Sequence, residues 1–447
     1  MGSILNRVFS TAFVAAIAFL AFLGGSFVVL GKVFPYDYLD SAYQAARALY
    51  AQRTQYREAT ATDLYVPARS DKRGVTIHDH ERAQSGLTLY TSSHDQRAFL
   101  ISMEGDVIHE WHLPFSAIWD ETAAAKKPWP DSFVIWDDIH LFPNGDLLAI
   151  YVGIGDTPWG YGLVKMDKDS QVVWKYLERA HHDLDIAGDG KIYLLTHELR
   201  FDKIETAQHL VPPRVDDYVV VLSPDGKELK KVSVLDALVK SPYGRLLIRI
   251  PWYATGEARN GDFTHANAVD LIRPETAAHL PFAKDGQVLV SLRELDMIAL
   301  LDLDREEIVW ALRGPWLGQH DPDVLQNGHI LLFDNAGNYG DGGQSRVIEF
   351  DPRTLEIVWS YAGDAQNPFE SIVRSGQERL SNGNTLITES DGGRLLEVAP
   401  DGTIVWEYVN PVRVGDEDEL IPIMSRGRRI DPASLDPGFL EPQVSSR

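Results

Sequence analysis

The sequence predicts an all-β fold, a six-bladed β-propeller preceded by an N-terminal transmembrane helix. Three observations lead to this prediction: an uncharged apolar run near the N-terminus, a strand-and-turn motif that recurs six times, and a tryptophan that recurs near the end of that motif. Repeats of about fifty residues built from short strands are typical of propellers, because one unit cannot bury both faces of its sheet alone. A chain of 447 residues can therefore close one ring as a single domain.

The apolar run extends from Val8 to Leu30 and holds 23 residues without a charge. A helix of that length crosses a bilayer, since each residue adds about 1.5 Å. The alternative is a cleaved secretory signal, which has a shorter apolar region followed by a small-x-small site. Here the bulky residues Phe34, Pro35 and Tyr36 follow the run, so we expect an uncleaved anchor.

This run sets the expected domain boundaries. We expect a transmembrane anchor at 1–32, a stalk or linker at 33–73 with helical spacing from Asp37 to Arg57, and the propeller at 74–447. Basic residues are few on both sides of the run, so the positive-inside rule does not choose an orientation for the anchor.

The repeated motif begins near Gly86 with a polar turn, most often Asn-Gly or Asp-Gly, that precedes a short apolar strand. Such turns are strong hairpin signals. We expect the strands that follow them to be the innermost strands of their blades. They are Leu87–Thr91, Leu147–Val152, Lys191–Thr196, Gln287–Leu292, His329–Asp334 and Thr385–Glu389.

A later strand in each unit ends near a tryptophan, except in the unit that contains Gly226–Val232. The tryptophans are Trp111, Trp174, Trp310, Trp359 and Trp406. We expect them to pack between blades, as large aromatic side chains commonly do in cores. A solenoid or a sandwich is the alternative fold, although a sandwich does not repeat one motif six times. The ring is expected to close by pairing residues near Gly74–Tyr90 with the last blade, since closure removes exposed strand edges.

The composition excludes several classes of function. Against 42 basic side chains stand 65 acidic ones, a net charge of −23, which repels nucleic acid and anionic lipid. The absence of cysteine excludes disulfides, thiolate metal sites and cysteine nucleophiles. The 14 histidines are the unusual feature, because imidazole serves as acid, base, nucleophile or metal ligand near neutral pH.

Histidines recur just before the expected inner strands. His140, His182, His265 and His320 hold this place in four consecutive units, and Glu378 holds it in another. Loops that lead into inner strands open on the central mouth of a propeller, so we expect these side chains to gather there. A single histidine is more often a structural residue, and His140 stays open between that role and a substrate contact.

Arg293 ends the strand that begins at Val288 and adds a fixed cation to the unit of His265. Imidazoles with one guanidinium and the carboxamide of Asn267 have two interpretations. One is a metal site, although close spacing such as His-Glu-x-x-His does not occur. The other is a site for an anion with several oxygens, in which arginine and protonated histidine donate and a neutral histidine acts as nucleophile.

At these residues the sequence resembles the bacterial aryl sulfotransferases that use aryl sulfate esters rather than a nucleotide donor. The resemblance covers about Gly86–Leu440, and the block around His320 is its most specific part. The matching motifs are His-x-Asn at His265–Asn267, Ser-x-Arg at Ser291–Arg293, the block Gln319–Asn335, the Ile-Val-Trp repeats and the closing stretch Ile423–Leu440. The resemblance implies a six-bladed propeller that acts outside the cytoplasm by a ping-pong route through a sulfated histidine.

The resemblance also implies roles for single residues. His320 matches the histidine that accepts the sulfuryl group, and Arg293, His265 and Asn267 match the residues that hold its oxygens. His182 matches a further pocket histidine, and a protonated His182 or His265 would donate a proton to the leaving phenolate. The four residues His182, His265, Arg293 and His320 are expected to converge at one end of the channel.

The expected function is transfer of a sulfuryl group from an aryl sulfate donor to a phenolic acceptor, without metal or cofactor. Neither a Walker-type loop nor G-x-G-x-x-G occurs in the chain, which agrees with a nucleotide-independent reaction. The expected location is the inner (plasma) membrane, with one span and the catalytic domain facing the periplasm or the exterior. Nothing in the sequence indicates an oligomeric state.

Two other functions stay open. A non-catalytic or sensory propeller would use the same donors to bind an anionic ligand or a protein partner at the membrane surface. A quinone-dependent dehydrogenase propeller is the weaker alternative, because its tryptophan-docking repeats and calcium-ligating cluster are not visible in the sequence.

Overall fold

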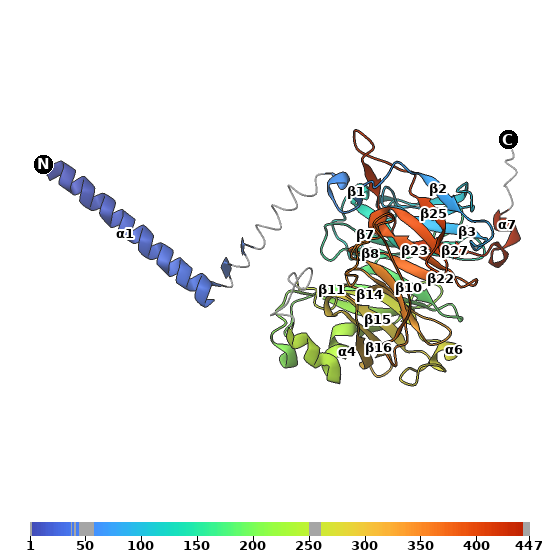
Figure 1. The fold of residues 1–447 in the computed structure, drawn as a ribbon. Coiled ribbons are helices and arrows are strands. Elements are labelled where there is room, and N and C mark those ends of the chain that lie inside the picture. The colour runs from blue at the N-terminus through green and yellow to red at the C-terminus, as the bar shows by residue number, and fades with distance from the viewer. Residues whose placement is uncertain (1, 37, 40–41, 44–57, 250–260, 441–447) are drawn as a thin grey trace. The chain divides into compact units, whose positions relative to one another are not determined.

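The computed structural model describes residues 2–36, 38–39, 42–43, 58–249 and 261–440, in two units that divide between Ala61 and Thr62. In the first unit α1 (Gly2–Gly31) is one helix, and its part Ala12–Gly31 is long and apolar enough to cross a membrane (Figure 1). This helix is consistent with a single-pass anchor. Most of the expected stalk from Asp37 to Arg57 lies outside the described residues.

The second unit is a ring of six antiparallel sheets, which confirms the predicted six-bladed propeller (Figure 1). From the axis outward, blade 1 consists of β27 (Gly427–Ile430), β3 (Leu87–Thr91), β4 (Arg97–Ile101) and β5 (Val107–His112). Blade 2 consists of β6 (Val134–Leu141), β7 (Leu147–Gly153), β8 (Gly160–Met166) and β9 (Val172–Tyr176). Blade 3 consists of β10 (Ala180–Ile186), β11 (Ile192–Arg200), β12 (Arg214–Leu222) and β13 (Glu228–Ser233). Blade 4 consists of β14 (Ala266–Leu271), β15 (Val288–Leu292), β16 (Met297–Asp302) and β17 (Glu307–Arg313). Blade 5 consists of β18 (His320–Val324), β19 (Ile330–Asp334), β20 (Arg346–Phe350) and β21 (Ile357–Ala362). Blade 6 consists of β22 (Gly376–Arg379), β23 (Thr385–Glu389), β24 (Arg394–Val398), β25 (Ile404–Val409) and β2 (Gly74–His78).

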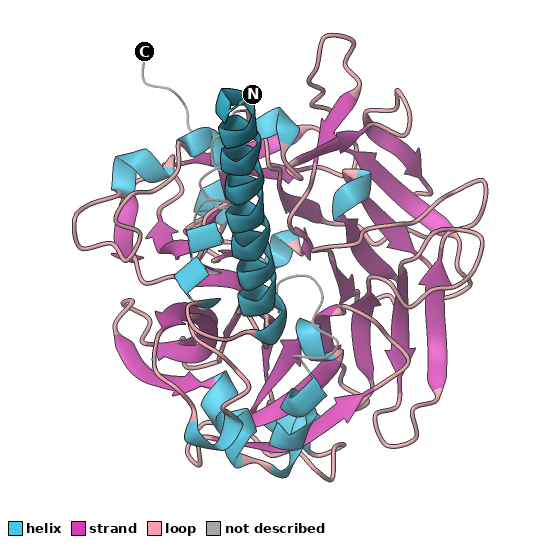
Figure 2. Ribbon diagram, turned by 90° about the vertical axis from the view of Figure 1, so that its left-hand side faces the viewer, coloured by secondary structure: helices cyan, strands magenta, loops and turns pink. Residues whose placement is uncertain are grey.

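Short helices occupy the loops between these strands (Figure 2). The α-helices are α3 (Phe115–Ile118), α4 (Val234–Lys240), α6 (Pro274–Ala277) and α7 (Pro437–Leu440). The 3-10 turns are η1 (Ala59–Ala61), which belongs to the first unit, and η2 (Asp131–Phe133), η3 (Glu205–Ala207), η4 (Pro242–Arg249), η6 (Arg293–Leu295), η7 (Ser390–Gly392) and η8 (Pro432–Ser434).

The assignment of the innermost strands was wrong by one position. The strands that follow the polar turns are second in their blades, and the strands before those turns line the axis. The inner strands were not predicted from the sequence, because they face a polar axis. For example, β10 reads Ala-His-His-Asp-Leu-Asp-Ile, without the apolar run that marks a buried strand.

Both ends of the soluble body take part in ring closure. The strand β2 adds to the outer edge of blade 6 beside β25, as expected for residues near Gly74. The C-terminal strand β27 supplies the innermost strand of blade 1 beside β3, which the sequence did not predict. In addition, β1 (Tyr65–Pro67) pairs with β26 (Leu420–Pro422), so the body extends ahead of residue 74.

Apolar cores fill the spaces between neighbouring blades. Among the residues that the structure describes, six clusters of buried side chains occur, and each contains side chains from two adjacent blades. Tryptophans of the outer strands stabilise these contacts. The indole N–H of Trp111 donates to the carbonyl of Gly145 in the next blade at 3.0 Å. Trp406 likewise donates to Met103 across the closure at 2.9 Å. The predicted packing of tryptophans between blades is confirmed.

Four inner strands contain irregularities at the same level. The register of β6, β10, β14 and β18 with the following strand shifts near Asp137, His182, Asn267 and Asp321. His182, at φ +57°, and Asp321, at φ +51°, adopt the left-handed conformation that side chains rarely take. Bulges re-aim side chains and are enriched beside functional sites. They turn the residues at this level toward the axis.

Candidate active site

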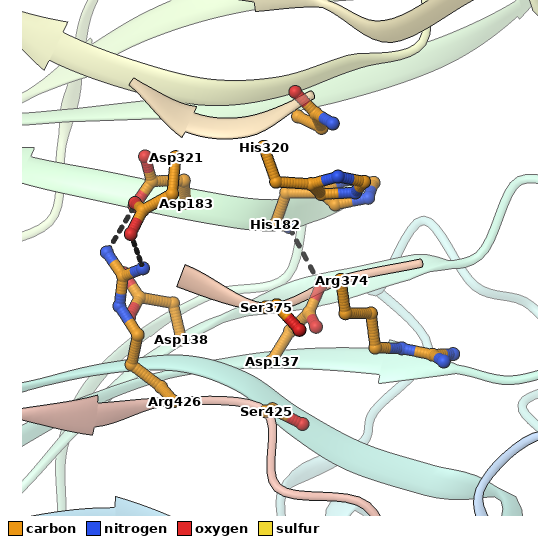
Figure 3. Close-up of a pocket in the computed structure, with 11 residues that line it drawn as sticks. Asp137, Asp138, His182, Asp183, His320, Asp321, Arg374, Ser375, Ser425 and Arg426 are labelled. Carbon is orange, nitrogen blue, oxygen red and sulfur yellow. Dashed lines mark hydrogen bonds and ion pairs between the residues drawn. The ribbon is translucent and has the colours of Figure 1, made fainter. Parts of the chain in front are cut away.

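A small pocket lies at the level of these bulges, on the axis of the propeller (Figure 3). The space inside it is about 30 Å³, which is enough for a small polar group. Inner strands and the loops before them supply the lining. The lining residues are Asp137, Asp138, His182, Asp183, Asn267, His320, Asp321, Arg374, Ser375, Ser425 and Arg426.

The structure brings together most of the candidate residues. His182, Asn267 and His320 line the pocket directly. The His265 ring lies 5.1 Å from the His182 ring, measured between centroids, and the backbone N–H of Arg293 donates to the His265 carbonyl at 3.2 Å. These five residues come from blades 3, 4 and 5.

His140 lies apart from this group. It is the seventh residue of β6, beyond the bulge, and its ring packs against Phe142 at 5.0 Å. Burial and the charge of Arg428 lower its pKa to about 4. Glu378, on β22, accepts a hydrogen bond from the backbone N–H of Arg429 at 3.0 Å. Neither His140 nor Glu378 lines the pocket.

The hydrogen bonds of His320 determine its neutral tautomer. Nδ1 of His320 lies 2.8 Å from Oδ1 of Asn335. The orientation of that carboxamide is fixed, because its Nδ2 donates to the carbonyls of Ser371 and Arg374 at 2.8 and 2.9 Å. Oδ1 of Asn335 is therefore the acceptor, and Nδ1 of His320 carries the proton. The lone pair is on Nε2.

His320 stays neutral across the physiological range. Burial and the nearby Arg293 charge lower its pKa to about 3. His320 is 5% exposed, so a charged form would lack the hydration that stabilises it in water. An uncharged imidazole with a free lone pair is the form that acts as a nucleophile.

His265 has the opposite character. Burial lowers its pKa, but Asp262, whose Oδ2 lies 2.6 Å from Nδ1, more than offsets that effect and leaves the pKa raised. The ring also packs against Trp159 with centroids 5.2 Å apart. His265 is therefore the imidazole of this group most easily protonated.

Two further donors flank the histidines. Nδ2 of Asn267 donates one hydrogen to the carbonyl of Gln319 at 2.9 Å, which leaves its second hydrogen for a ligand. The guanidinium of Arg293 pairs with Glu294 through Nη1 at 2.8 Å. Its Nε is buried and forms no hydrogen bond within the described part of the chain. Arg293 thus retains unused donor capacity.

The other side of the pocket is an ion-pair cluster around Arg426 (Figure 3). Its guanidinium lies 2.9 Å from Asp138, 3.3 Å from Asp183 and 2.7 Å from Asp321, one aspartate from each of three blades. Burial lowers the pKa of Arg426, but these carboxylates outweigh it and hold the pKa well above its usual range. In Figure 3 the imidazoles of His182 and His320 extend away from this cluster.

Arg374 is a cation of the pocket that was not predicted from the sequence. It lines the pocket, and its Nη1 lies 2.9 Å from Asp63. A signal for it exists, because Arg374 and Ser375 come directly before inner strand β22, as His265 comes directly before β14. The aspartates were missed because their strands were not recognised as inner strands. Arg426 was missed because it lies in the C-terminal segment that closes the ring.

Fold and site together define a six-bladed propeller with an axial pocket that combines neutral imidazoles with arginines. Residues 138–411, more than half of the chain, match the model of the arylsulfotransferase (ASST) family. The chain therefore belongs to the arylsulfotransferase family, which supports an aryl sulfotransferase activity in general terms. No curated protein matches the chain.

Several solved structures match the chain at low identity. A protein of unknown function from Bacteroides caccae is 13% identical, with a TM-score of 0.47, over 76% of this chain and 99% of that chain. Virginiamycin B lyase from Staphylococcus aureus is 11% identical, with a TM-score of 0.39, over 80% and 88%. The WD40 β-propeller domain of Doa1 is 10% identical, with a TM-score of 0.39, over 83% and 99%.

The Arg426 cluster yields a prediction on stability. Arg426→Met should lower the free energy of unfolding by about 3–5 kcal/mol, because it leaves buried carboxylates without their cation. Burial already raises the pKa of Asp183, and loss of Arg426 should raise it further. A carboxyl group with a raised pKa in the folded state stabilises the fold below its unfolded pKa and loses that contribution as the pH rises through the folded pKa.

The destabilisation should therefore be larger at about pH 8 than at about pH 5. Urea unfolding of both proteins at the two pH values measures the difference. Arg353→Met removes an exposed ion pair with Asp351 and is the control, with little expected change at either pH. A cost for Arg426→Met that is independent of pH would contradict this view of the cluster.

Proposed function

We propose that this propeller transfers a sulfuryl group from an aryl sulfate ester to a phenol, through a sulfated intermediate on His320. The observation that carries the proposal is the fixed tautomer of His320, whose Nδ1–H is held by Asn335 at 2.8 Å. A neutral imidazole with its Nε2 lone pair in an anion pocket is suited to attack sulfur. Family membership supports the same reaction class.

In the first half-reaction, Nε2 of His320 attacks sulfur in line with the ester oxygen. The N–S bond forms, the S–O bond to the aryl group breaks, and its electron pair leaves with the phenolate. Sulfuryl transfer resembles phosphoryl transfer, in which positioning and charge stabilisation supply most of the catalysis. Arg293, His265 and Asn267 would hold the three sulfuryl oxygens, as an oxyanion hole does.

In the second half-reaction, the oxygen of a phenol attacks the sulfur of sulfated His320. A new S–O bond forms, the N–S bond breaks, and its electron pair returns to Nε2. Each half-reaction moves one proton, from the enzyme to the first phenolate and from the second phenol to the enzyme. The pocket also presents Arg374 as a second guanidinium for the transferred group.

The charges of the histidines refine the expected roles. A protonated His182 was one candidate proton donor, but burial and the neighbouring His181 hold its pKa well below the usual range. His265, whose pKa is raised, would instead supply a positive charge to a sulfuryl oxygen. His182 would remain neutral.

In the proposed arrangement residues 1–32 anchor the chain, and the unit that begins at Thr62 is the catalytic body. The protein would be a single-pass protein of the inner (plasma) membrane with the propeller facing the periplasm or the exterior. The apolar part of α1, Ala12–Gly31, supports the anchor. No cofactor takes part in the proposed reaction.

A non-catalytic propeller that binds a small anion is the second candidate function. Its support is that pocket donors such as Asn267 and Arg374 suit the binding of an anion as well as its transfer. The two functions differ in one observable. A transferase releases the phenol from an aryl sulfate, whereas a binding protein leaves the ester intact.

The test is incubation of the full-length protein with a chromogenic aryl sulfate and a phenol acceptor, without any nucleotide. His320→Ala should abolish release of the phenol. Arg293→Ala should lower kcat/KM by an amount equivalent to about 2–4 kcal/mol, the scale for loss of one oxyanion donor. His140→Ala, outside the pocket, should cause a much smaller loss. Binding of the aryl sulfate without release of phenol by the wild type would support the second candidate instead.

The contact of His320 with Asn335 yields a prediction on pH dependence. In a single turnover without acceptor, release of phenol by the wild type should not slow as the pH is lowered to about 5, because the pKa of His320 is about 3. Asn335→Asp places a carboxylate beside Nδ1, which favours the imidazolium and raises that pKa. The acid limb of the pH–rate profile should therefore move to higher pH.

A matched control is Asn327→Asp, because Asn327 contacts His329 at 3.2 Å on the surface, away from the pocket. It should leave the pH–rate profile unchanged. An acid limb in Asn335→Asp at the same pH as in the wild type would refute the assigned role of the His320–Asn335 bond.

A further inference from the structure

A row of buried groups leads from the pocket into the wall between blades 3 and 4. His182 lines the pocket, and its Nδ1 lies 2.7 Å from Nδ1 of its neighbour His181. Nε2 of His181 in turn lies 3.5 Å from Oδ1 of Asp217. The side chains of His181 and Asp217 are 0% exposed. Among the described residues, neither Nε2 of His181 nor Oδ1 of Asp217 has a hydrogen-bond partner, so at 3.5 Å the two atoms face each other without a formed hydrogen bond.

We propose that Asp217 and His181 form a proton relay to Nε2 of His182, so that a neutral His182 serves as acid for the departing phenolate and as base for the incoming phenol. This inference rests on the proposed sulfuryl transfer. His182 would be the catalytic residue, because it faces the pocket. His181 and Asp217 would act through it.

The short contact between the two Nδ1 atoms allows two states. In the donor state, Nδ1–H of His181 donates to Nδ1 of His182, so the proton of neutral His182 is on Nε2. His181 then accepts at Nε2 from a protonated Asp217. In the acceptor state every proton has moved one place. Asp217 is a carboxylate, Nε2–H of His181 donates to it, Nδ1–H of His182 donates to His181, and Nε2 of His182 carries a lone pair.

The two states balance the protons of both half-reactions. Transfer of the Nε2 proton of His182 to the leaving phenolate converts the donor state into the acceptor state. Transfer of a proton from the incoming phenol to Nε2 of His182 restores the donor state. Asp217 is the group whose charge changes between the two states, and both imidazoles are neutral in each of them.

The surroundings of Asp217 suit a carboxyl group that gains and loses a proton. Its Oδ2 accepts hydrogen bonds from the hydroxyl of Thr264 and the N–H of Ala266, both at 2.7 Å, so Oδ1 is the oxygen left to hold the proton. Burial and the nearby Asp262 raise the pKa of Asp217 to about 8. That value lies below the reference pKa of about 10 for a phenol and near neutral pH, which suits reversible transfer.

A histidine that carried the proton as a cation would not serve as well here. Burial and the charge of His265 lower the pKa of His181 to about 3. The pKa of His182 also lies well below its usual range. The nearby carboxylate of Asp262 raises the pKa of His181, but burial outweighs it, so an imidazolium in this row would be a poorly stabilised buried charge. The relay instead places its only charge on a carboxylate with two hydrogen-bond donors.

A metal site is the other interpretation of this cluster. One potential ligand atom from each of His181, His197 and Asp217 lies within 4.8 Å of the others. However, Nε2 of His197 accepts the N–H of Gly160 at 2.9 Å, so Nδ1 of the neutral ring carries the proton. His197 therefore has no free lone pair for a metal, and the relay is the better account.

The experiment compares two donors in a single turnover, before any acceptor is added. 4-Nitrophenyl sulfate releases a stable phenolate that needs no proton, whereas phenyl sulfate releases a basic one. Asp217→Asn can still donate to Nε2 of His181 but cannot exchange a proton. It should slow release from phenyl sulfate by about 100-fold or more and leave release from 4-nitrophenyl sulfate nearly unchanged, since general acid catalysis contributes about 10²–10⁴-fold.

Asp185→Asn is the matched control, because Asp185 is a part-buried aspartate on β10 that pairs with Arg273 at 2.6 Å outside the pocket. It should slow neither donor. Normal release from 4-nitrophenyl sulfate also shows that Asp217→Asn has folded. If that variant fails to fold, Thr264→Val, which weakens the carboxylate form of Asp217, should show a smaller selective loss with phenyl sulfate.

Equal slowing of both donors, or of neither, by a folded variant would overturn the relay while the sulfuryl transfer stands. A stoichiometric metal in the purified wild type, absent from Asp217→Asn, would also overturn it. Failure of the wild type to release phenol from either donor would instead overturn the proposed function. The outcomes for the two proposals are thus separate.

Discussion

The axis of this propeller depends on the ion pairs of Arg426. This residue precedes the C-terminal strand β27, which completes blade 1, and its guanidinium joins Asp138, Asp183 and Asp321 of three other blades. The ion pairs on the axis therefore depend on ring closure, because Arg426 reaches the three carboxylates only when β27 pairs with β3. The interaction also offsets part of the negative charge in the acidic half of a pocket that would otherwise repel an anion. Without it, a sulfate ester would have no favourable place among the imidazoles.

In the other half of the pocket, the surroundings of the histidines give them different charge states. Burial keeps His320 and His182 neutral, whereas Asp262 raises the pKa of His265. A histidine nucleophile must be uncharged, whereas a histidine that binds an oxyanion benefits from positive charge. Histidine can therefore fill both roles when the neighbouring residues differ. The left-handed backbone of His182 and His265 adds strain of the kind that concentrates at functional sites.

Local sequence signals predicted the parts of this structure that depend on local chemistry. The Asn-Gly turns and the Ile-Val-Trp strands specified six blades, and the block around His320 pointed to its family. The inner strands were misassigned because they face a polar axis and lack an apolar run. Arg374 and Arg426 escaped prediction because loops and ring closure bring them to the pocket, which no local pattern encodes. Similarly, the pair His181–His182 was visible in the sequence, but only the fold shows that Asp217 lies behind it.

The central claim is that His320 carries the sulfuryl group, and the most direct measurement is to locate that group. The wild type is exposed briefly to an aryl sulfate with radiolabelled sulfur, in the absence of acceptor, and is then digested at neutral pH. The account predicts one acid-labile label on the peptide that contains His320, no label in His320→Ala, and loss of the label when a phenol is added. A wild type that turns over without any labelled intermediate, or a label on another residue that persists in His320→Ala, would contradict the account.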